Sequence, residues 1–598
     1  MSRWSENTPL FRPSRWATLV LGIAAVVVGA VLTAQPFRSL TVLAWLVAIG
    51  LVLTGLTELV MADSSPTPGW SRSVALVWIV AGVAAAAWPG ITITALAVVV
   101  GVVLVITGVA KVVEAVRGFG DERFVAGLNG LTSVAVGGLA LAWPAVTVLV
   151  MAVVFGVRTV LFGLGQIARA LRMRSATGGG QVITLTTSGE LVSVEPAGRW
   201  SSGLRLVGAV LAFVVALGGT AISVVIHRAG PDDPGAFYSA PSSMPEGPTG
   251  TIIRSEVVDG YFAGATTHRV LYISTGFDGE PTAVSGIIVV PNGPVPDGGR
   301  KVLAYTHGTV GVAPKCAPSI AGGSLDPLGI EGGPEFIAAG YVIASTDYQG
   351  LGTAGPHPYL IGSSEAMNAL DIVRAARNLS DAHAGSDFAV WGHSQGGHAS
   401  LFTGQLAATY APELHLVGVA AGAPVPDLIE LFKVNIETTV GKILIAMAMQ
   451  SWSRLYDAEL GDIVTPAARP IVGRIAENCL YSKLELLASV PGALALELTF
   501  VSKPPWEADP WKTIAASNTP GQSPTGVPML VTQGAADTIV DPSVTEAFVS
   551  HLCASGEHVE FHLMPGIGHL DGGPAATPKV VAWMADRFAG RPATSTCT

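Results

Sequence analysis

The residues best suited to chemistry surround Ser394, the middle residue of the pentapeptide Gly392–Gly396, which reads G-H-S-Q-G. The apolar segment 388–391 precedes the pentapeptide, and a helical pattern over 395–409 follows it. A G-x-S-x-G pattern between a strand and a helix is typical of a sharp turn that exposes the serine hydroxyl. The start of such a helix also places a backbone N–H and a positive dipole end beside a developing oxyanion. We therefore predict that Ser394 is a nucleophile.

A serine hydroxyl needs a base that takes its proton, and the base needs an acid that orients it. In sites of this kind the acid and then the histidine follow the serine along the chain. Asp537, just beyond the strand-like segment 528–533, is the predicted acid, whereas the alternative, Asp541, is placed to cap the next helix. His569, in a glycine-rich loop after the segment 558–564, is the predicted base. Three other histidines fall within predicted helices or strands, where packing or surface roles are expected: His551, His558 and His562.

An oxyanion hole requires two donors. One is predicted to be the backbone N–H of Gln395, next to the nucleophile. The other is expected from the loop after an early strand, and Thr309 follows the predicted strand 301–306. Gly308 would let this backbone approach closely, and His307 is interpreted as a supporting histidine without a catalytic role.

Short β-rich segments alternate with helical ones from about residue 251, which predicts βαβ units and a largely parallel sheet. The predicted strands are 251–258, 268–275, 284–290, 301–306, 341–346, 387–392, 415–421, 528–533 and 558–564. The predicted helices are 363–379, 395–409, 542–553 and 575–588. Residues 425–520 interrupt this rhythm with apolar helical stretches (428–452 and 481–499) and prolines. We interpret this stretch as a helical cap inserted over the site.

The composition differs between the two parts of the 598-residue chain. Residues 1–228 contain 15 Lys and Arg but only 8 Asp and Glu, so this part is basic. The rest of the chain contains 18 Lys and Arg and 35 Asp and Glu, so it is acidic. Half of all residues are hydrophobic and only 13% are charged, which excludes a disordered protein. The net charge of −10 argues against a nucleic-acid binder.

Most of the apolar runs in the first part have the length that a helix needs to cross a bilayer. The seven runs are about 17–35, 40–61, 73–88, 91–113, 124–143, 145–168 and 204–227. Lys and Arg gather in alternate loops, so we predict that the N-terminus is cytoplasmic and that everything after Arg228 lies outside the cytoplasm. All four cysteines fall in that second part, which fits an oxidising compartment.

The first six runs are predicted to form three copies of a helical hairpin. Each copy places a proline, a glycine 19 residues later and a polar residue 22 residues later: Pro36, Gly55 and Glu58; Pro89, Gly108 and Lys111; Pro144, Gly163 and Gln166. Arg158 lies inside the sixth run and is interpreted as a structural residue paired with a neighbour such as Glu58. Residues 175–202 are a polar insert with a predicted hairpin over 181–195, and 229–250 read as a linker.

Three motifs of the second part resemble the secretory lipase family of fungi and actinobacteria. They are Tyr305–Thr309 (Y-T-H-G-T), Asp347–Gly352 (D-Y-Q-G-L-G) and Gly392–Gly397 (G-H-S-Q-G-G), and the likeness covers about residues 250–590. The resemblance implies a capped α/β-hydrolase that cleaves carboxylic esters, including acylglycerols, with its triad at Ser394, Asp537 and His569. Residues predicted to line the substrate site are His307, Gly308, Tyr348, Gln349 and His393.

The same resemblance implies the disulfides Cys316–Cys479 and Cys553–Cys597, whereas the sequence alone allows three connectivities. The apolar first part is the departure from this family, whose typical member is secreted and free. That part, over about residues 17–172, resembles the HdeD-like, short-repeat membrane proteins linked to acid stress. This likeness rests on the three hairpin repeats.

We therefore expect a multi-domain protein with an all-α membrane domain of seven transmembrane helices, followed by an α/β-hydrolase domain with a helical cap. The expected domains are 1–174 (three membrane hairpins), 175–202 (cytoplasmic insert), 203–228 (seventh span), 229–250 (linker) and 251–598 (hydrolase). The predicted function is a membrane-anchored serine ester hydrolase, a lipase or carboxylesterase, whose partners are an ester or lipid substrate and the bilayer.

No cofactor or metal is expected, because the sequence has no H-E-x-x-H pattern, no Walker loop and no dinucleotide-binding glycine pattern. Two alternatives stay open. One is a peptidase, thioesterase or acyltransferase on the same triad, because a fold does not fix the substrate. The other is a membrane stress or envelope-integrity protein with an accessory hydrolase.

Overall fold

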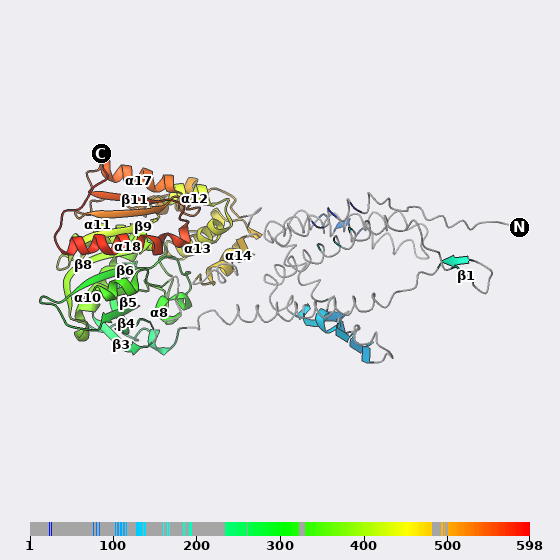
Figure 1. Cartoon of the computed structure of the whole chain (residues 1–598), viewed down its shortest axis with the longest axis horizontal. Helices are drawn as coiled ribbons and strands as arrows, with labels where there is room; N and C mark the ends of the chain where they lie inside the picture. Colours follow the sequence, from blue (N-terminus) through cyan, green and yellow to red (C-terminus); the bar gives the residue numbers. More distant parts are fainter. Residues whose placement is uncertain are drawn as a thin grey trace. The chain divides into compact units, whose positions relative to one another are not determined.

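The computed structural model describes residues 234–597 apart from 260, 322–328 and most of 481–499, together with scattered positions between 19 and 193. The chain divides into two compact units, Met1–His227 and Arg228–Thr598 (Figure 1). Most residues of the seven apolar runs, and Arg158, lie outside the described residues. Within the described part, no helix is both long enough and apolar enough to span a membrane.

The first unit contains one described hairpin and one close helix crossing. Strand β1 (Ile183–Leu185) pairs antiparallel with β2 (Leu191–Ser193), as the alternation over 181–195 predicted. At the crossing, a Cβ on Gly108 would lie 2.7 Å from the carbonyl oxygen of Gly130, and a Cβ on Gly130 would lie 2.8 Å from that of Gly108. Small residues allow this approach of two helix backbones, so Gly108 of the predicted repeat has a packing role.

A nine-stranded sheet forms the centre of the second unit, in the order β11-β10-β9-β8-β6-β7-β5-β4-β3. Its strands are β3 (Ile252–Val258), β4 (Ala265–Thr275), β5 (Pro281–Pro291), β6 (Arg300–Thr306), β7 (Val342–Thr346), β8 (Ala384–His393), β9 (His415–Gly422), β10 (Met529–Gly534) and β11 (Val559–Met564). Strands β6 to β11 run parallel to one another, whereas β3, β4 and β5 form antiparallel hairpins and β5 is antiparallel to β7. The short connections after β3 and β4 allow only the antiparallel arrangement.

Helices cover both faces of this sheet. Side chains of α10 (Gly362–Asn378), α11 (Gln395–Tyr410) and α17 (Pro542–Ala554) pack with one set of strand residues. Side chains of α9 (Gly333–Ala338) and α18 (His569–Phe588) pack with the other set, and α18 crosses the strands in red in Figure 1. Burial on both faces explains why the parallel strands read as continuous apolar runs. The helix predicted at 575–588 begins earlier, at His569.

The inserted stretch forms a helical layer with its own apolar cluster, which includes Met447, Trp452 and Trp511. Its helices are α12 (Leu428–Asn435), α13 (Thr439–Leu455), α14 (Arg469–Ala476) and α16 (Trp511–Ser517). The predicted helix 428–452 is thus two helices, because Thr438 caps the start of α13 by accepting a hydrogen bond from the N–H of Gly441. The predicted segment 481–499 lies mostly outside the described residues. The remaining short helices are α8 (Pro318–Ala321) and the 3-10 turns Ala236–Tyr238, Pro314–Cys316, Ser380–Ala382, Leu460–Asp462 and Pro505–Glu507.

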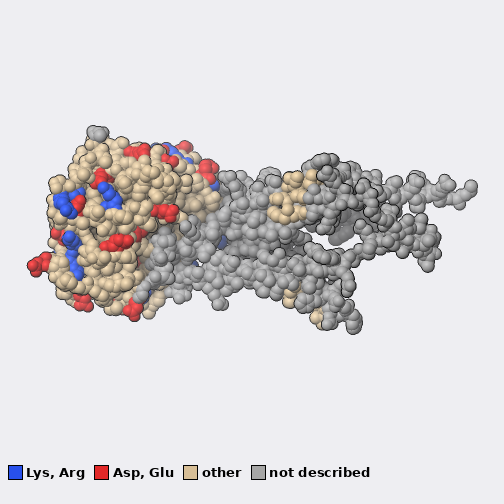
Figure 2. Space-filling view, viewed as in Figure 1, with Lys and Arg blue, Asp and Glu red and all other residues tan. Residues whose placement is uncertain are grey.

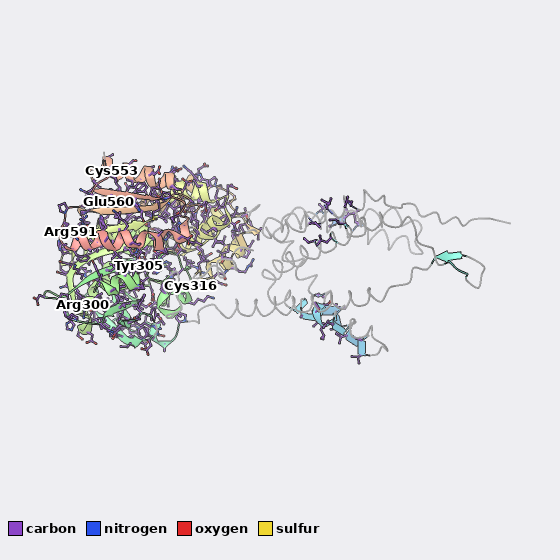
Figure 3. All side chains as sticks on the ribbon, in the orientation of Figure 1. Arg300, Tyr305, Cys316, Cys553, Glu560 and Arg591 are labelled. Atoms are coloured by element: carbon purple, nitrogen blue, oxygen red, sulfur yellow. A yellow bond between two sulfur atoms is a disulfide. The ribbon has the colours of Figure 1, made fainter. Side chains whose placement is uncertain are left out.

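Two disulfides link distant parts of the second unit, and both match the pairing that the family resemblance implied. Cys316, in the segment after β6, is bonded to Cys479 in the cap. Cys553, at the end of α17, is bonded to Cys597 near the C-terminus. Figure 3 labels one cysteine of each pair. The first bond joins the cap to the loop that follows β6.

The charged surface residues of the second unit are dispersed on the face shown in Figure 2, where Asp and Glu alternate with uncharged side chains. Some charged residues of this unit form ion pairs, such as Arg269 with Glu256 and Lys433 with Glu430. On this face no patch of one sign marks a binding site, so the site has to be found from its geometry.

Candidate active site

Ser394 lies at the junction between β8 and α11, in a backbone conformation that few residues other than glycine adopt. Its φ is 60° and its ψ is −121°. Such a conformation is strained and clusters at functional sites. A Cβ on Gly392 would collide with the side chain of Thr306, and a Cβ on Gly396 would collide with the Thr306 carbonyl oxygen. The two glycines therefore let the turn pack against the end of β6.

Three residues predicted from separate segments meet at this turn. The Nε2 atom of His569 lies 2.9 Å from the Oγ atom of Ser394, and its Nδ1 atom lies 2.7 Å from Oδ2 of Asp537. Asp537 is 5% exposed and His569 is 8% exposed. Ser394 follows β8, Asp537 follows β10 and His569 follows β11. A serine, an imidazole and a carboxylate in this sequence of contacts can perform nucleophilic acyl transfer.

Asp537 is held as a carboxylate by its surroundings. Its Oδ1 atom accepts hydrogen bonds from the N–H groups of Ile539 (2.8 Å) and Val540 (2.9 Å). Its Oδ2 atom accepts from Nε2 of Gln533 at 3.0 Å. Burial by itself would raise the pKa of Asp537, but the contacts with His569 and the two N–H groups hold that pKa below its usual value. An ionised acid can stabilise the imidazolium that forms during catalysis.

A second histidine and a buried carboxyl group lie behind His569. The rings of His393 and His569 are 4.8 Å apart between centroids, and Nδ1 of His393 is 3.7 Å from Oε1 of Glu331. Burial, and then the neighbouring His569, lower the pKa of His393 to about 3. Burial raises the pKa of Glu331 to about 8. Both groups are therefore neutral at pH 7, and neither adds charge next to the predicted base.

The predicted oxyanion loop lies directly beside Ser394. A Cβ built on Gly308 would be 3.9 Å from Cβ of Ser394, so the backbone of this loop approaches the nucleophile closely. The side chain of Thr309 is fixed by a 2.8 Å hydrogen bond between its Oγ1 atom and the hydroxyl of Tyr359. Gln395 is the first residue of α11, and the N–H groups of a first helical turn have no partner within the helix. Gln395 thus begins the helix at the turn, and Thr309 follows Gly308 in the loop beside it.

The other predicted substrate-site residues make mainly internal contacts. His307 is 2% exposed, and its ring nitrogens lie near the carbonyl oxygens of Gly308 (2.7 Å) and Asp347 (3.2 Å). The hydroxyl of Tyr348 donates to the carbonyl oxygen of His307 at 3.3 Å. Gln349 accepts at its Oε1 from the N–H of Phe277, at 2.8 Å. These side chains support the loops that surround the turn.

The alternative acid, Asp541, has the capping role that its position suggested. Its Oδ1 atom accepts from the N–H of Ser543 at the start of α17. His551 lies on α17, His562 lies on β11 and His558 immediately precedes that strand. Among the described residues, the Asp537 carboxylate is the one in contact with His569.

Several residues around the turn were not predicted. Thr306 donates from its hydroxyl to the carbonyl oxygen of Gly396 at 2.8 Å and so fixes the turn to β6. Thr306 belongs to the Y-T-H-G-T motif, so this motif could have indicated its role from the sequence. Glu365 and His398 form a buried pair behind Gln395. No local pattern marks these two residues, because the contact depends on how α10 and α11 pack.

The described residues contain no group of three or more His, Cys, Asp or Glu placed to hold a metal ion. The parallel sheet with helices on both faces, the strained serine turn and its order of partners define an α/β-hydrolase fold. Residues 334–596 match the secretory lipase family. Residues 20–75, 73–137 and 128–192 match the family described as a short repeat of unknown function (DUF308). Both family resemblances noted in the sequence are confirmed.

Curated relatives and solved structures agree with this assignment. The chain is 27% identical to "Probable inactive lipase MT1628" of Mycobacterium tuberculosis over 61% of its own length and 83% of the relative's. It is 27% identical to "Lipase A" of Arthroderma benhamiae over 60% and 80%. The crystal structure of Candida antarctica lipase A matches with a TM-score of 0.53 and 21% identity, over 62% of this chain and 89% of that one, and shows the shared fold. The family match and the relatives support a hydrolase of the lipase and esterase class.

Proposed function

We propose that the chain is a serine ester hydrolase, a lipase or carboxylesterase, with Ser394, His569 and Asp537 as its catalytic triad. The observation that carries this proposal is the unbroken series of contacts from Ser394 Oγ through His569 to Asp537, at 2.9 and 2.7 Å. The name of the Mycobacterium tuberculosis relative includes the words "probable inactive". In the present chain all three groups lie within hydrogen-bond distance, which supports an active site.

In the proposed reaction, Ser394 Oγ attacks the ester carbonyl carbon while Nε2 of His569 takes the hydroxyl proton. His569 then gives this proton to the leaving alcohol, and an acyl-enzyme remains on Ser394. Water, deprotonated by the same imidazole, attacks the acyl carbon; the bond from that carbon to Ser394 Oγ then breaks, His569 returns the proton to Oγ, and the carboxylic acid is released. Asp537 keeps Nδ1 protonated and stabilises the imidazolium in both halves of the reaction.

The negative charge on the tetrahedral intermediate is stabilised in this proposal by the backbone N–H groups of Gln395 and Thr309. The loss of one such donor typically costs about 100- to 1,000-fold in kcat. Support comes from the position of Gln395 at the first turn of α11 and from the approach of Gly308 to Ser394. The hydrogen bond between the side chains of Thr309 and Tyr359 holds the loop that contains Thr309 in place.

We further propose that the apolar first part anchors the enzyme in a membrane, with the N-terminus in the cytoplasm and the hydrolase outside it. The support is the apolar sequence, the distribution of Lys and Arg, the DUF308 matches and the secretory lipase match of the second part. Two disulfides in the second part fit an oxidising compartment. A phosphatase reporter fused after Arg228 should be active, and an inactive reporter in well-expressed protein would contradict this topology.

Substrate specificity tests the reaction class. The full chain, purified in detergent, is assayed with p-nitrophenyl esters of increasing acyl length and with the matching p-nitroanilides. We expect ester turnover that is lost in Ser394→Ala, with the folded domain retained by circular dichroism. Amide cleavage without ester cleavage would replace the esterase proposal by a peptidase.

A further inference from the structure

A buried carboxylate and imidazole lie behind the nucleophile turn, and the proposed reaction does not use them. Glu365 is in the first turn of α10, and His398 is in the first turn of α11, one turn after Ser394. Their side chains are 1% and 0% exposed. Oε2 of Glu365 lies 2.8 Å from Nδ1 of His398. Polar groups buried this deeply are stable only when they are hydrogen-bonded, so the partners of this pair indicate what it does in the fold.

The contacts of His398 fix the position of one of its protons. Its Nε2 atom lies 2.8 Å from the backbone carbonyl oxygen of Asn518, which can only accept, so Nε2 carries a proton. A hydrogen bond between Nδ1 of His398 and Oε2 of Glu365, which are 2.8 Å apart, requires one further proton on one of these two atoms. The pair is satisfied whether this proton is on the imidazole or on the carboxyl group.

The other oxygen of Glu365 holds the residue after the nucleophile. Oε1 accepts a hydrogen bond from Nε2 of Gln395 at 2.8 Å and another from the N–H of Leu360 at 3.1 Å. Gln395 is 1% exposed, and among the described residues its Oε1 atom has no partner. Glu365 is thus the described residue that fixes the Gln395 side chain. The backbone N–H of Gln395 is one of the two proposed oxyanion donors.

The same pair also contacts the end of the cap. Asn518 directly follows α16, at the C-terminal end of the inserted stretch. Besides its carbonyl contact with His398, its Oδ1 atom accepts from the N–H of Gly362, the first residue of α10, at 3.0 Å. A continuous series of hydrogen bonds therefore runs from the cap through His398 and Glu365 to Gln395.

We propose that Glu365 and His398 are positioning residues, which fix the oxyanion donor Gln395 and connect it to the end of the cap at Asn518. This inference rests on the proposed function. Removal of the Glu365 carboxylate leaves the Gln395 amide, the Leu360 N–H and His398 without their acceptor or partner. The helix start that carries the oxyanion donor then loses its support, although no group that touches the substrate has changed.

The isosteric variant Glu365→Gln should be tolerated. Its amide oxygen can accept from Gln395 and Leu360, and its amide nitrogen can donate to Nδ1 of a neutral His398. Glu365→Asp keeps the carboxylate but is one methylene too short to reach Gln395 and His398 together. Positioning thus predicts that the isosteric amide variant, Glu365→Gln, is active and that the shorter carboxyl variant, Glu365→Asp, is impaired.

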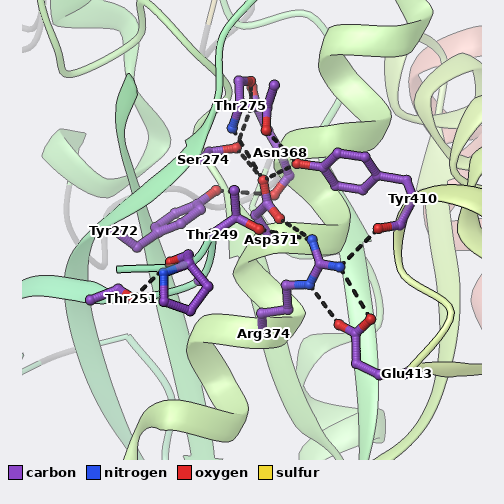
Figure 4. Close-up of polar contacts among 12 residues, drawn as sticks. Thr249, Thr251, Tyr272, Ser274, Thr275, Asn368, Asp371, Arg374, Tyr410 and Glu413 are labelled. Carbon is purple, nitrogen blue, oxygen red and sulfur yellow. Dashed lines mark hydrogen bonds and ion pairs between the residues drawn. The ribbon is translucent and has the colours of Figure 1, made fainter. Parts of the chain in front are cut away.

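Asp371 offers a matched control in the same helix. Its buried carboxylate accepts from Ser274, Tyr410 and Arg374, and Arg374 also bonds Glu413, as Figure 4 shows. This network does not include Gln395. Asp371→Asn should lower the unfolding temperature of the hydrolase domain but leave kcat within about twofold.

The experiment measures kcat and KM for p-nitrophenyl butyrate with the full chain in detergent, for the wild type and for E365Q, E365D, E365A and D371N. We expect E365D and E365A to lower kcat by about 10- to 100-fold with KM changed less than about threefold, because misplaced groups slow the chemical step. E365Q should stay within about threefold of the wild type. Full kcat in E365D, or equal loss in E365Q and E365A, would overturn the proposal.

Amide hydrogen exchange on the same samples tests the positioning role independently of catalytic activity. In E365D, peptides that cover 394–400 and 514–519 should exchange faster together, whereas E365Q and D371N should leave both unchanged. If the wild type itself cleaves no ester, the proposed function fails, and the exchange data alone decide the positioning claim. Unchanged exchange in both peptides of E365D would overturn that claim even in an active enzyme.

Discussion

Replacement of Glu331 by glutamine should stabilise the hydrolase domain in a pH-dependent manner. The side chain of Glu331 is 9% exposed, it packs against Gly573 of α18, and its Oε2 atom has no hydrogen-bond partner among the described residues. Burial raises its pKa from 4.5 to about 8. Between these two pH values the unfolded chain has released the proton, whereas the folded protein keeps it.

The sign and the size of the effect follow from this difference. Because the folded-state pKa is raised, the contribution to stability is complete below pH 4.5 and is lost as the pH rises to about 8. At about 1.4 kcal/mol per pH unit, the loss approaches about 5 kcal/mol. Glutamine has a similar shape and no proton to release, so Glu331→Gln avoids this loss. The variant should match the wild type near pH 4.5 and exceed it most above pH 8.

Urea unfolding of the full chain in mild detergent, followed by tryptophan fluorescence at pH 5 and pH 8.5, measures this difference. Trp391 is a suitable reporter, because its Nε1 atom donates to the carbonyl oxygen of Glu331. The free energy of unfolding of Glu331→Gln minus that of the wild type should grow by several kcal/mol between the two pH values. A constant difference would show that Glu331 is ionised in the folded protein and would refute the reasoning.

Three further predictions test the site and the packing around it. Asp537→Asn should lower kcat for ester hydrolysis by about 10⁴-fold with an unchanged circular dichroism spectrum; activity above a tenth of the wild type would remove Asp537 from the triad. Gly396→Ala should destabilise the domain by more than about 3 kcal/mol in urea unfolding, because its Cβ collides with the Thr306 carbonyl oxygen. The control Gly473→Ala, in open space on α14, should be neutral or stabilising, and equal behaviour of the two variants would contradict this packing. Joint replacement of Cys316 and Cys479 by serine removes a link between residues 163 positions apart and should cost about 2–5 kcal/mol; an unchanged unfolding temperature under non-reducing conditions would show that this bond is not formed in solution.

Much of the hydrolase fold could be predicted because each strand carries an apolar run bounded by turn residues. The contact between Ser394, Asp537 and His569 could be predicted because each residue follows such a run and the chain order restricts the choices. The antiparallel pairing of β3 to β5 was not predicted, because apolar content alone does not distinguish parallel from antiparallel strands. The early start of α18 was also missed, since Gly572, Gly573 and Pro574 disfavour a helix that packing against the sheet nevertheless stabilises.

The residues that support the triad were less accessible to sequence analysis. Glu365, His398 and Glu331 are ionisable residues in or next to helices, where a sequence pattern suggests exposure to solvent. Their burial depends on contacts between segments far apart in the chain, such as the bond from His398 to Asn518. Periodicity carries no information on such contacts. Sequence motifs therefore pointed to the three proposed catalytic residues, whereas the structure was needed to find the residues that hold them.

The most direct test of the central claim is covalent labelling of Ser394 on intact cells with a membrane-impermeant fluorophosphonate. Such a probe reacts with a serine that an adjacent imidazole has activated. The account predicts that the probe is found on the peptide that contains Ser394 without permeabilisation, and that Ser394→Ala abolishes the label. No label even after permeabilisation would contradict the proposed nucleophile, and a label only after permeabilisation would contradict the proposed location outside the cytoplasm.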